Sequence, residues 1–121
     1  MAAGVVQIPW YATLFRGDQF AAAVAEVAPI AMRYGALDYI VYRNRDDQYK
    51  FLQCATWESK AEWEAYWYGP EMTTFKTVHS GWYQVPVLYT FADVVASGDR
   101  NGKDREIITN GTPTTSDAQA S

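Results

Sequence analysis

The sequence predicts one α+β domain in which two helices cover one face of a four-stranded antiparallel sheet. Residues 5–15, 37–44, 49–57 and 82–95 show the alternating apolar pattern typical of strands. Between the first and second strands, and between the third and fourth, apolar residues recur at the spacing of amphipathic helices. The resulting β-α-β-β-α-β order is the split arrangement of ferredoxin-like folds.

The first strand and helix carry three marks of their boundaries. Pro9 should place the early part of the strand at an edge or a bulge, because proline cannot donate to a strand ladder. Asp18 can cap the helix, and Gly35 can end it. Pro29 lies inside the helical pattern, so we expect a kink or a restart immediately before it.

The second half of the domain begins with a hairpin whose polar loop covers residues 45–48. Ser59 and Glu62 form a capping box that should start the second helix. A Gly-Pro pair interrupts this helix, and a new short helix is expected over residues 70–79. Pro86 should break the final strand.

The chain has room for one domain, which we place at residues 5–96 of the 121. Residues 97–121 are rich in Gly, Asp, Thr and Ser and should form a polar, flexible tail. In the domain, strand residues are apolar on both faces of the sheet. The helix-free face should therefore be buried against a second copy, giving a homodimer in the form of a dimeric α+β barrel.

Charge and composition exclude several kinds of partner. The net charge is −4 and no basic run is present, which argues against nucleic acid. No apolar stretch reaches the roughly 18–20 residues that span a bilayer, so membrane insertion is not expected. The single cysteine, Cys54, cannot form an internal disulfide. We expect a cytoplasmic protein.

Aromatic residues, 16% of the chain, suggest a crowded core or a pocket for a flat ligand. Trp63, Tyr66 and Trp67 share one helix face that should look inward, mainly as core, whereas Tyr68 falls outside this stripe. Tyr68 must then face solvent, a partner or a cavity. Most tryptophans fall between the third and fourth strands, so an aromatic pocket is expected between the second helix and the sheet.

His79, the only histidine, has two interpretations. It can cap a helix end, or it can serve as a general base or axial ligand beside the aromatic cluster. No His or Cys stands at ligand spacing with the nearby glutamates, so no dedicated metal site is expected.

The Trp-Glu-Ser junction at residues 57–59, the aromatic helix and the Gly-Pro break together resemble the antibiotic-biosynthesis-monooxygenase-like family of dimeric α+β barrels. The similarity spans roughly residues 5–95. The resemblance implies one of three outcomes. Some members oxidise quinols or polyketide aromatics with O2 and no cofactor, some bind and break haem, and others have no known reaction.

The haem-degrading branch carries an Asn on the first strand, a Trp on the second helix and a His about nine residues later. Here the first strand has no Asn, Tyr66 stands at the Trp position, and Phe75 stands at the His position. Trp67 and His79 lie nearby at shifted positions. Haem binding or degradation is therefore the third hypothesis for function.

The leading hypothesis is a homodimeric, cofactor-independent oxygenase that acts on a phenolic or quinol-like aromatic. In this hypothesis His79 accepts a proton, and Tyr11 or Tyr66 donates a hydrogen bond to the developing phenolate. The residues expected to shape the substrate pocket are Trp57, Trp63, Trp67, Tyr68 and Phe75.

The competing hypothesis is a non-catalytic binding or structural subunit that docks on a larger assembly. The single histidine and the lack of a recognisable catalytic set favour it. The docking surface would then include exposed rings such as Tyr68 and tail residues such as Ile107 and Ile108.

Overall fold

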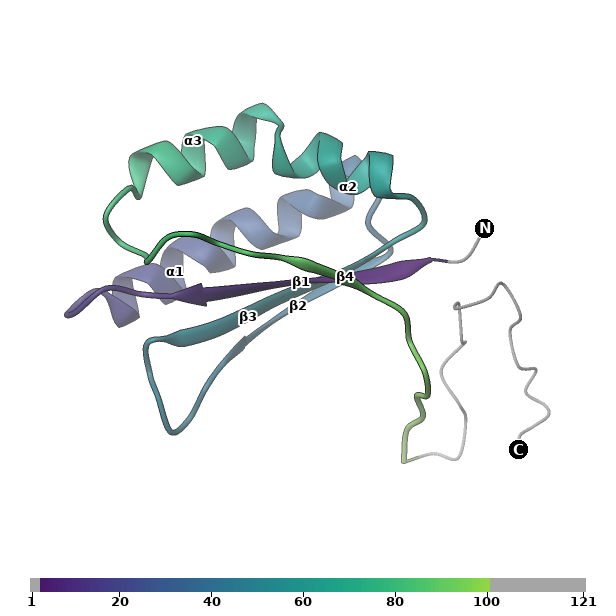
Figure 1. The fold of residues 1–121 in the computed structure, drawn as a ribbon, viewed down its shortest axis with the longest axis horizontal. Helices are drawn as coiled ribbons and strands as arrows, with labels where there is room; N and C mark the ends of the chain where they lie inside the picture. Colours follow the sequence, from purple (N-terminus) through teal and green to yellow (C-terminus); the bar gives the residue numbers. More distant parts are fainter. Residues whose placement is uncertain (1–2, 101–121) are drawn as a thin grey trace.

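The computed structural model describes residues 3–100 and consists of one sheet with helices on one side (Figure 1). The predicted tail falls mostly outside these residues, and Ile107 and Ile108 fall outside them entirely. The elements in chain order are β1 (Gly4–Tyr11), α1 (Gly17–Val27), the 3-10 helix η1 (Ala28–Tyr34), β2 (Asp38–Arg43), β3 (Lys50–Trp57), α2 (Lys60–Trp67), α3 (Pro70–Val78) and β4 (Thr90–Ala92).

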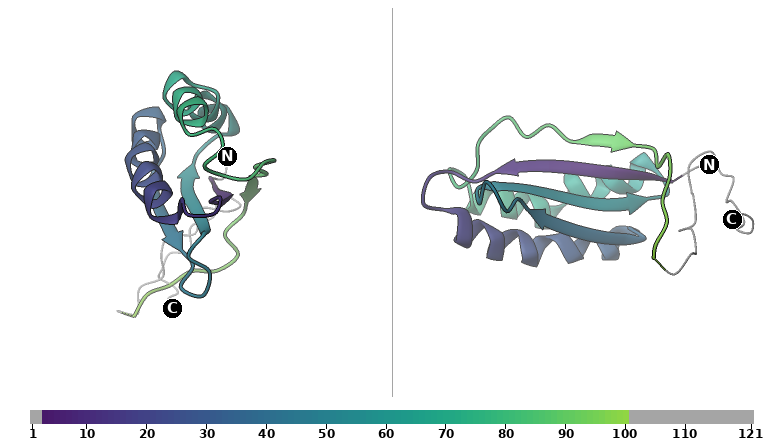
Figure 2. Two further views of the ribbon diagram at one scale, coloured as in Figure 1. Left: turned by 90° about the vertical axis from the view of Figure 1, so that its left-hand side faces the viewer. Right: turned by 90° about the horizontal axis from the view of Figure 1, so that it is seen from below.

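The sheet has the strand order β2-β3-β1-β4, and every neighbouring pair is antiparallel. All helices lie on one face, and the opposite face carries none (Figure 2). This confirms the predicted α+β fold with its split β-α-β-β-α-β order. Among residues 3–100, no helix has both the length and the apolar character needed to cross a membrane.

The first helix changes type where the sequence predicts a restart. α1 gives way to η1 at Ala28, and Pro29 occupies the first turn of the new segment, where a missing N–H costs least. Gly35 ends it with φ of 107°, a left-handed conformation that favours glycine. The expected cap was wrong: Asp18 lies inside the first turn of α1 and pairs with Arg43 at 3.0 Å.

The start of α2 confirms half of the expected capping box. The Ser59 Oγ accepts a hydrogen bond from the Glu62 N–H at 3.2 Å. The Glu62 carboxylate packs against Gly35, and its Oε1 is buried with no hydrogen-bond partner in the described part of the chain. Gly69 separates α2 from α3, and Pro70 begins α3 as predicted.

The core lies between the helices and the sheet and is mostly aromatic. β1 alternates between buried residues that face the helices and more exposed residues on the other face. The largest fully buried side chains are Trp10, Trp57, Trp63, Tyr66, Phe20, Ile8, Met72, Gln53, Val6 and Val24. The inward orientation predicted for Trp63, Tyr66 and Trp67 is confirmed.

The final strand is much shorter than predicted. Of residues 82–95, only Thr90–Ala92 form β4, and a separate antiparallel bridge joins Tyr83 to Ala12. The intervening segment leaves the sheet, and its Val85–Pro86 peptide bond is cis. The expected break at Pro86 is present, but it removes most of the strand.

Candidate functional site

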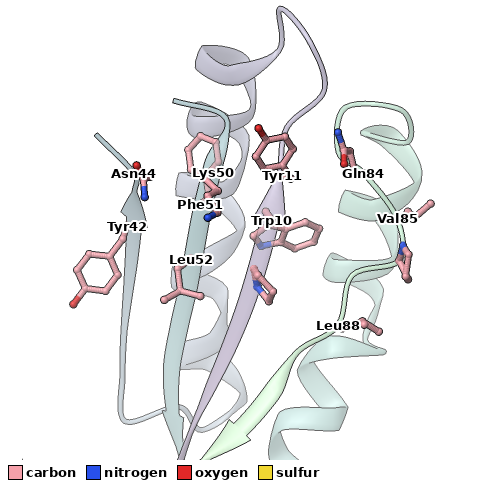
Figure 3. Close-up of a pocket in the computed structure, with 12 residues that line it drawn as sticks. Trp10, Tyr11, Tyr42, Asn44, Lys50, Phe51, Leu52, Gln84, Val85 and Leu88 are labelled. Atoms are coloured by element: carbon pink, nitrogen blue, oxygen red, sulfur yellow. The ribbon is translucent and has the colours of Figure 1, made fainter. Parts of the chain in front are cut away.

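A groove of about 710 Å³ lies on the helix-free face, at the end of the sheet where β1 finishes. Its walls come from β2, β3, β1 and the segment that leaves the sheet before β4 (Figure 3). The lining is mostly apolar. It consists of Pro9, Trp10, Tyr11, Tyr42, Asn44, Lys50, Phe51, Leu52, Gln84, Val85, Pro86 and Leu88.

A change of strand register opens this groove. Ala12 pairs with Tyr83 at one end and Gln7 with Thr90 at the other, so four residues of β1 face six residues of the returning segment. The surplus must bulge away from the sheet. If the register of Ala12 with Tyr83 continued along β1, Pro9 would lie opposite Pro86. In this register Tyr11 and Gln84 form a hydrogen-bonded pair, since the Gln84 N–H donates to the Tyr11 carbonyl, and the next hydrogen-bonded pair would be Pro9 with Pro86. Neither proline has an N–H, so no ladder bond can form there.

The polar end of the groove is built around Tyr11. Its hydroxyl donates to Asp47 Oδ2 at 2.8 Å, and the Asp47 Oδ1 accepts from the Tyr49 N–H at 3.1 Å. The hydrogen bond to Asp47 raises the pKa of Tyr11, with burial and the Asp47 charge adding to it. Tyr11 is therefore a neutral phenol whose hydrogen is already directed to a carboxylate.

Asn44, at the end of β2, has a fixed orientation. Its Oδ1 accepts from the backbone N–H groups of Asp46 and Asp47 at 2.8 and 2.9 Å. Because the oxygen is held in this turn, the amide nitrogen is the free end of the side chain, with two donors. Asn44 therefore adds hydrogen-bond donors to the groove lining.

Most of the predicted site residues lie on the other side of the sheet. Trp57, Trp63, Tyr66, Trp67 and Phe75 are all buried in the helix–sheet core. The Trp63 and Trp67 rings stack with centroids 5.2 Å apart, and Phe75 packs edge-on to Trp10 at 5.7 Å. The structure brings these rings together as packing, and none of them lines the groove.

Tyr66 is committed to the core by its hydrogen bonds. Its hydroxyl donates to the Val27 carbonyl at 2.8 Å and accepts from Gln53 Nε2 at 3.1 Å. Burial raises the pKa of Tyr66 to about 12. Its hydroxyl hydrogen is thus occupied, as is that of Tyr11.

Two buried indole N–H groups have no hydrogen-bond partner among residues 3–100, those of Trp57 and Trp63. Their rings meet edge-on, with centroids 6.0 Å apart. An N–H near an aromatic face recovers part of a hydrogen bond, which fits a packed core.

His79 follows α3 and acts as a cap. Its Nδ1 lies 2.8 Å from the Phe75 carbonyl, and its ring packs against Phe75 and Trp82 at 4.6 and 4.7 Å. It lines neither this groove nor the smaller cavity described below. His79 therefore does not supply an axial ligand for haem in either cavity.

Tyr68 points away from the core and is 68% exposed. The Lys76 ammonium lies 5.8 Å from its ring and 4.0 Å from that of Trp67, so one cation covers both. Of the three outcomes predicted for Tyr68, a position in either cavity is excluded, and solvent or a partner stays the prediction.

A second cavity of about 360 Å³ continues along the helix-free face toward the other end of the strands. Its lining includes Cys54, whose thiol pKa is raised by burial and by the Asp38 charge. Tyr42 and Leu52 line both cavities and join them into one hollowed face.

Of the predicted site residues, Tyr11 alone lines the groove. Sequence patterns do not single out Asn44, Lys50 and Gln84, because these residues lie outside any motif. Pro9 and Pro86 were the available signal, since two prolines in strands that must pair predict a gap between them.

Comparisons with known proteins agree on the fold. The antibiotic biosynthesis monooxygenase family matches over residues 16–78, more than half of the chain. A protein from Pseudomonas aeruginosa is similar with a TM-score of 0.71 and 14% identity, covering 79% of this chain and 97% of that one. SnoaB, described as a cofactor-independent oxygenase from Streptomyces nogalater, has a TM-score of 0.67 and 12% identity, with 80% and 97% covered.

A protein from Mycobacterium tuberculosis gives a TM-score of 0.68 at 11% identity, over 81% of this chain and 100% of that one. No curated protein matches the sequence. At these identities the structural similarity establishes the shared fold.

Proposed function

We propose that this chain, which belongs to the antibiotic biosynthesis monooxygenase family, is a homodimeric oxygenase that oxidises a phenolic or quinol-like aromatic without a cofactor. The observation that carries the proposal is the groove, whose volume and apolar walls suit a flat ligand of a few rings. The similarity to SnoaB, described as a cofactor-independent oxygenase, supports the same chemistry. In the overall reaction, a phenol and O2 give a quinone and water.

The residues of the groove suit the first step of such a reaction, which is loss of the phenolic proton. The Tyr11 oxygen can accept that proton while its own hydrogen passes to Asp47, to which it is already bonded at 2.8 Å. The resulting phenolate is the electron-rich species that reacts with O2. Tyr11 is thus a catalytic residue in this proposal, as a proton relay instead of the simple donor predicted from sequence.

A second copy packed on the helix-free face would close the groove. Ile40 and Tyr42 on β2 are 47% and 53% exposed there, and Leu88 is also exposed. Covering them would bury apolar surface and exclude water from the groove, which strengthens its electrostatic interactions. The polar end lies at the margin of the sheet, where a ligand could still enter.

Oxygen uptake on a panel of quinols and naphthols tests the site with three variants. Leu52→Trp, which fills the groove, and Tyr11→Phe, which removes the relay, should both lower the rate at least tenfold. His79→Ala tests the original prediction. If His79→Ala abolishes uptake and Leu52→Trp does not, the groove assignment is wrong. If no member of the panel supports uptake, the oxygenase proposal fails.

The second candidate, a docking subunit, is favoured by the same exposed apolar residues of β2. A different chain could cover them as well as a second copy could. Native mass spectrometry of the protein isolated gently from its source distinguishes the two. A dimer with a bound aromatic supports the oxygenase, and a mass that includes other chains supports docking.

A further inference from the structure

We infer that the groove is selective for an aromatic anion, whose charged oxygen is bound at the end formed by Lys50 and Asn44. The inference deepens the proposed function and rests on it, because the anion that this site holds is the phenolate left once Tyr11 has taken the phenolic proton. It follows from the distribution of charge and hydrogen-bond donors around the groove.

Lys50 supplies the charge. Of the described residues that line the groove, it alone is charged, and it stands directly opposite Tyr11 in the β1–β3 register. Within residues 3–100 its ammonium forms no ion pair, since the one salt bridge there joins Arg43 to Asp18. Its positive charge is therefore available to a ligand in the groove.

Asn44 stands beside Lys50, and Gln84 lies on the far side of Tyr11 from it (Figure 3). Each adds a side-chain amide to this end of the groove. Asn44 presents its amide N–H groups, because its oxygen is held by two backbone N–H groups. Gln84 is held at this end by the bond from its own N–H to the Tyr11 carbonyl at 2.8 Å. An ammonium group beside an amide donor is a suitable environment for an oxyanion.

The nearby carboxylate does not compete for the lysine. Asp47 Oδ2 accepts from the Tyr11 hydroxyl and Oδ1 from the Tyr49 N–H, at 2.8 and 3.1 Å. Each oxygen therefore already has a donor, and neither lies within ion-pair distance of Lys50. The Asp47 charge is directed to Tyr11 and leaves the ammonium to the ligand.

The opposite end of the groove is apolar and defines the rest of the ligand. The lining there is carbon surface, from Pro9, Leu52, Val85, Pro86 and Leu88. A ligand that matches both ends has a flat hydrocarbon ring system and one ionised oxygen at its margin. Acidic phenols and hydroxyquinones belong to this class, whereas neutral ethers of the same shape lack the charge.

Binding to the full chain tests this by isothermal titration calorimetry, without any turnover. The probes are 2-hydroxy-1,4-naphthoquinone, an anion at neutral pH, and its neutral 2-methoxy ether. The wild type should prefer the anion. Lys50→Met should weaken anion binding about tenfold and leave the ether unchanged, as expected for loss of one charge-assisted hydrogen bond. Lys50→Arg should keep the preference, and Lys60→Met, at the start of α2, should match the wild type.

The possible failures are separate. Equal affinity for both probes, or a preference that survives in Lys50→Met, overturns the anion site and leaves the groove in place. No binding of either probe overturns the anion site together with the groove. Selective anion binding without oxygen uptake supports the anion site, while the oxygenase proposal fails.

Discussion

Gln53 on β3 and Tyr66 on α2 are joined by a buried hydrogen bond of 3.1 Å between the amide nitrogen and the phenolic oxygen. The amide oxygen of Gln53 accepts from Trp10 Nε1 at 2.9 Å, and the Tyr66 hydroxyl donates to the Val27 carbonyl at 2.8 Å. The chain of bonds ties the sheet to α2 and to the end of α1. Because it is sealed from water, each member depends on the others for its partners.

Replacing Gln53 with Leu should lower the free energy of unfolding by about 1–3 kcal/mol, because the Trp10 N–H is then buried without an acceptor. Urea denaturation followed by tryptophan fluorescence measures the change. Gln19→Leu is the matched control, since Gln19 is exposed on α1 and its side chain accepts a hydrogen bond of 3.3 Å from the exposed end of Arg16. A loss for Gln53→Leu no larger than for the control would show that the chain of bonds contributes nothing.

Gly69 is fixed by lack of space. A Cβ there would lie 2.5 Å from the Ala65 carbonyl oxygen and 2.9 Å from the Tyr34 hydroxyl. Gly69→Ala should therefore destabilise the protein by about 1–3 kcal/mol through overpacking at the α2–α3 junction. In Gly81→Ala nothing lies within 4 Å of the new Cβ, and only the left-handed φ of 89° costs energy, about 1 kcal/mol. Thermal unfolding compares the two, and a Gly69→Ala variant as stable as Gly81→Ala would contradict the packing argument.

The bond between Tyr34 and Glu71 predicts a dependence of stability on acid. Tyr34 donates to Glu71 Oε1 at 2.5 Å, and this bond lowers the pKa of Glu71 below its ordinary value of 4.5. Since the folded pKa is the lower one, the stabilisation is complete above pH 4.5 and is lost as pH falls through the folded value. Tyr34→Phe should be less stable than the wild type at neutral pH, and the two should converge in acid.

The measurement is the urea midpoint of both proteins across this pH range. Glu71→Gln, which cannot titrate, serves as the control. The difference in stability between Glu71→Gln and the double variant with Tyr34→Phe added should not change as pH falls. If the difference in urea midpoint between wild type and Tyr34→Phe stays constant throughout the acid range, protonation of Glu71 does not weaken this bond.

The fold was predictable because its periodic signals agree with its tertiary environment. The strands and helices up to residue 79 follow apolar spacing, and local signals at Pro29, Gly35 and Ser59 mark real boundaries. The extent of the last strand was not predictable, because the rings of residues 82–95 alternate in the same way whether or not their backbone pairs with β1. The pairing depends on a change of register between β1 and the returning segment, and these two segments are more than 70 residues apart in the sequence.

The site was less predictable, because rings that suit a pocket suit a core equally well. Trp57, Trp63 and Trp67 were assigned to a pocket by composition, but the structure packs them against one another and Tyr89. The roles proposed for Lys50 and Asn44 depend on the groove that the bulge opens across β1. Their importance depends on tertiary geometry.

The proposed homodimer predicts which substitutions separate its subunits. Tyr42→Glu and Ile40→Glu place a charge on the helix-free face, where burial against a second copy would desolvate it. Either variant should convert a dimer into monomers, measured by sedimentation velocity at fixed protein concentration. Tyr68→Glu is the matched control, because Tyr68 is equally aromatic, 68% exposed, and on the helix side of the sheet. If Tyr68→Glu dissociates the protein and the β2 variants do not, the subunits associate through α2, and the groove stays open to solvent.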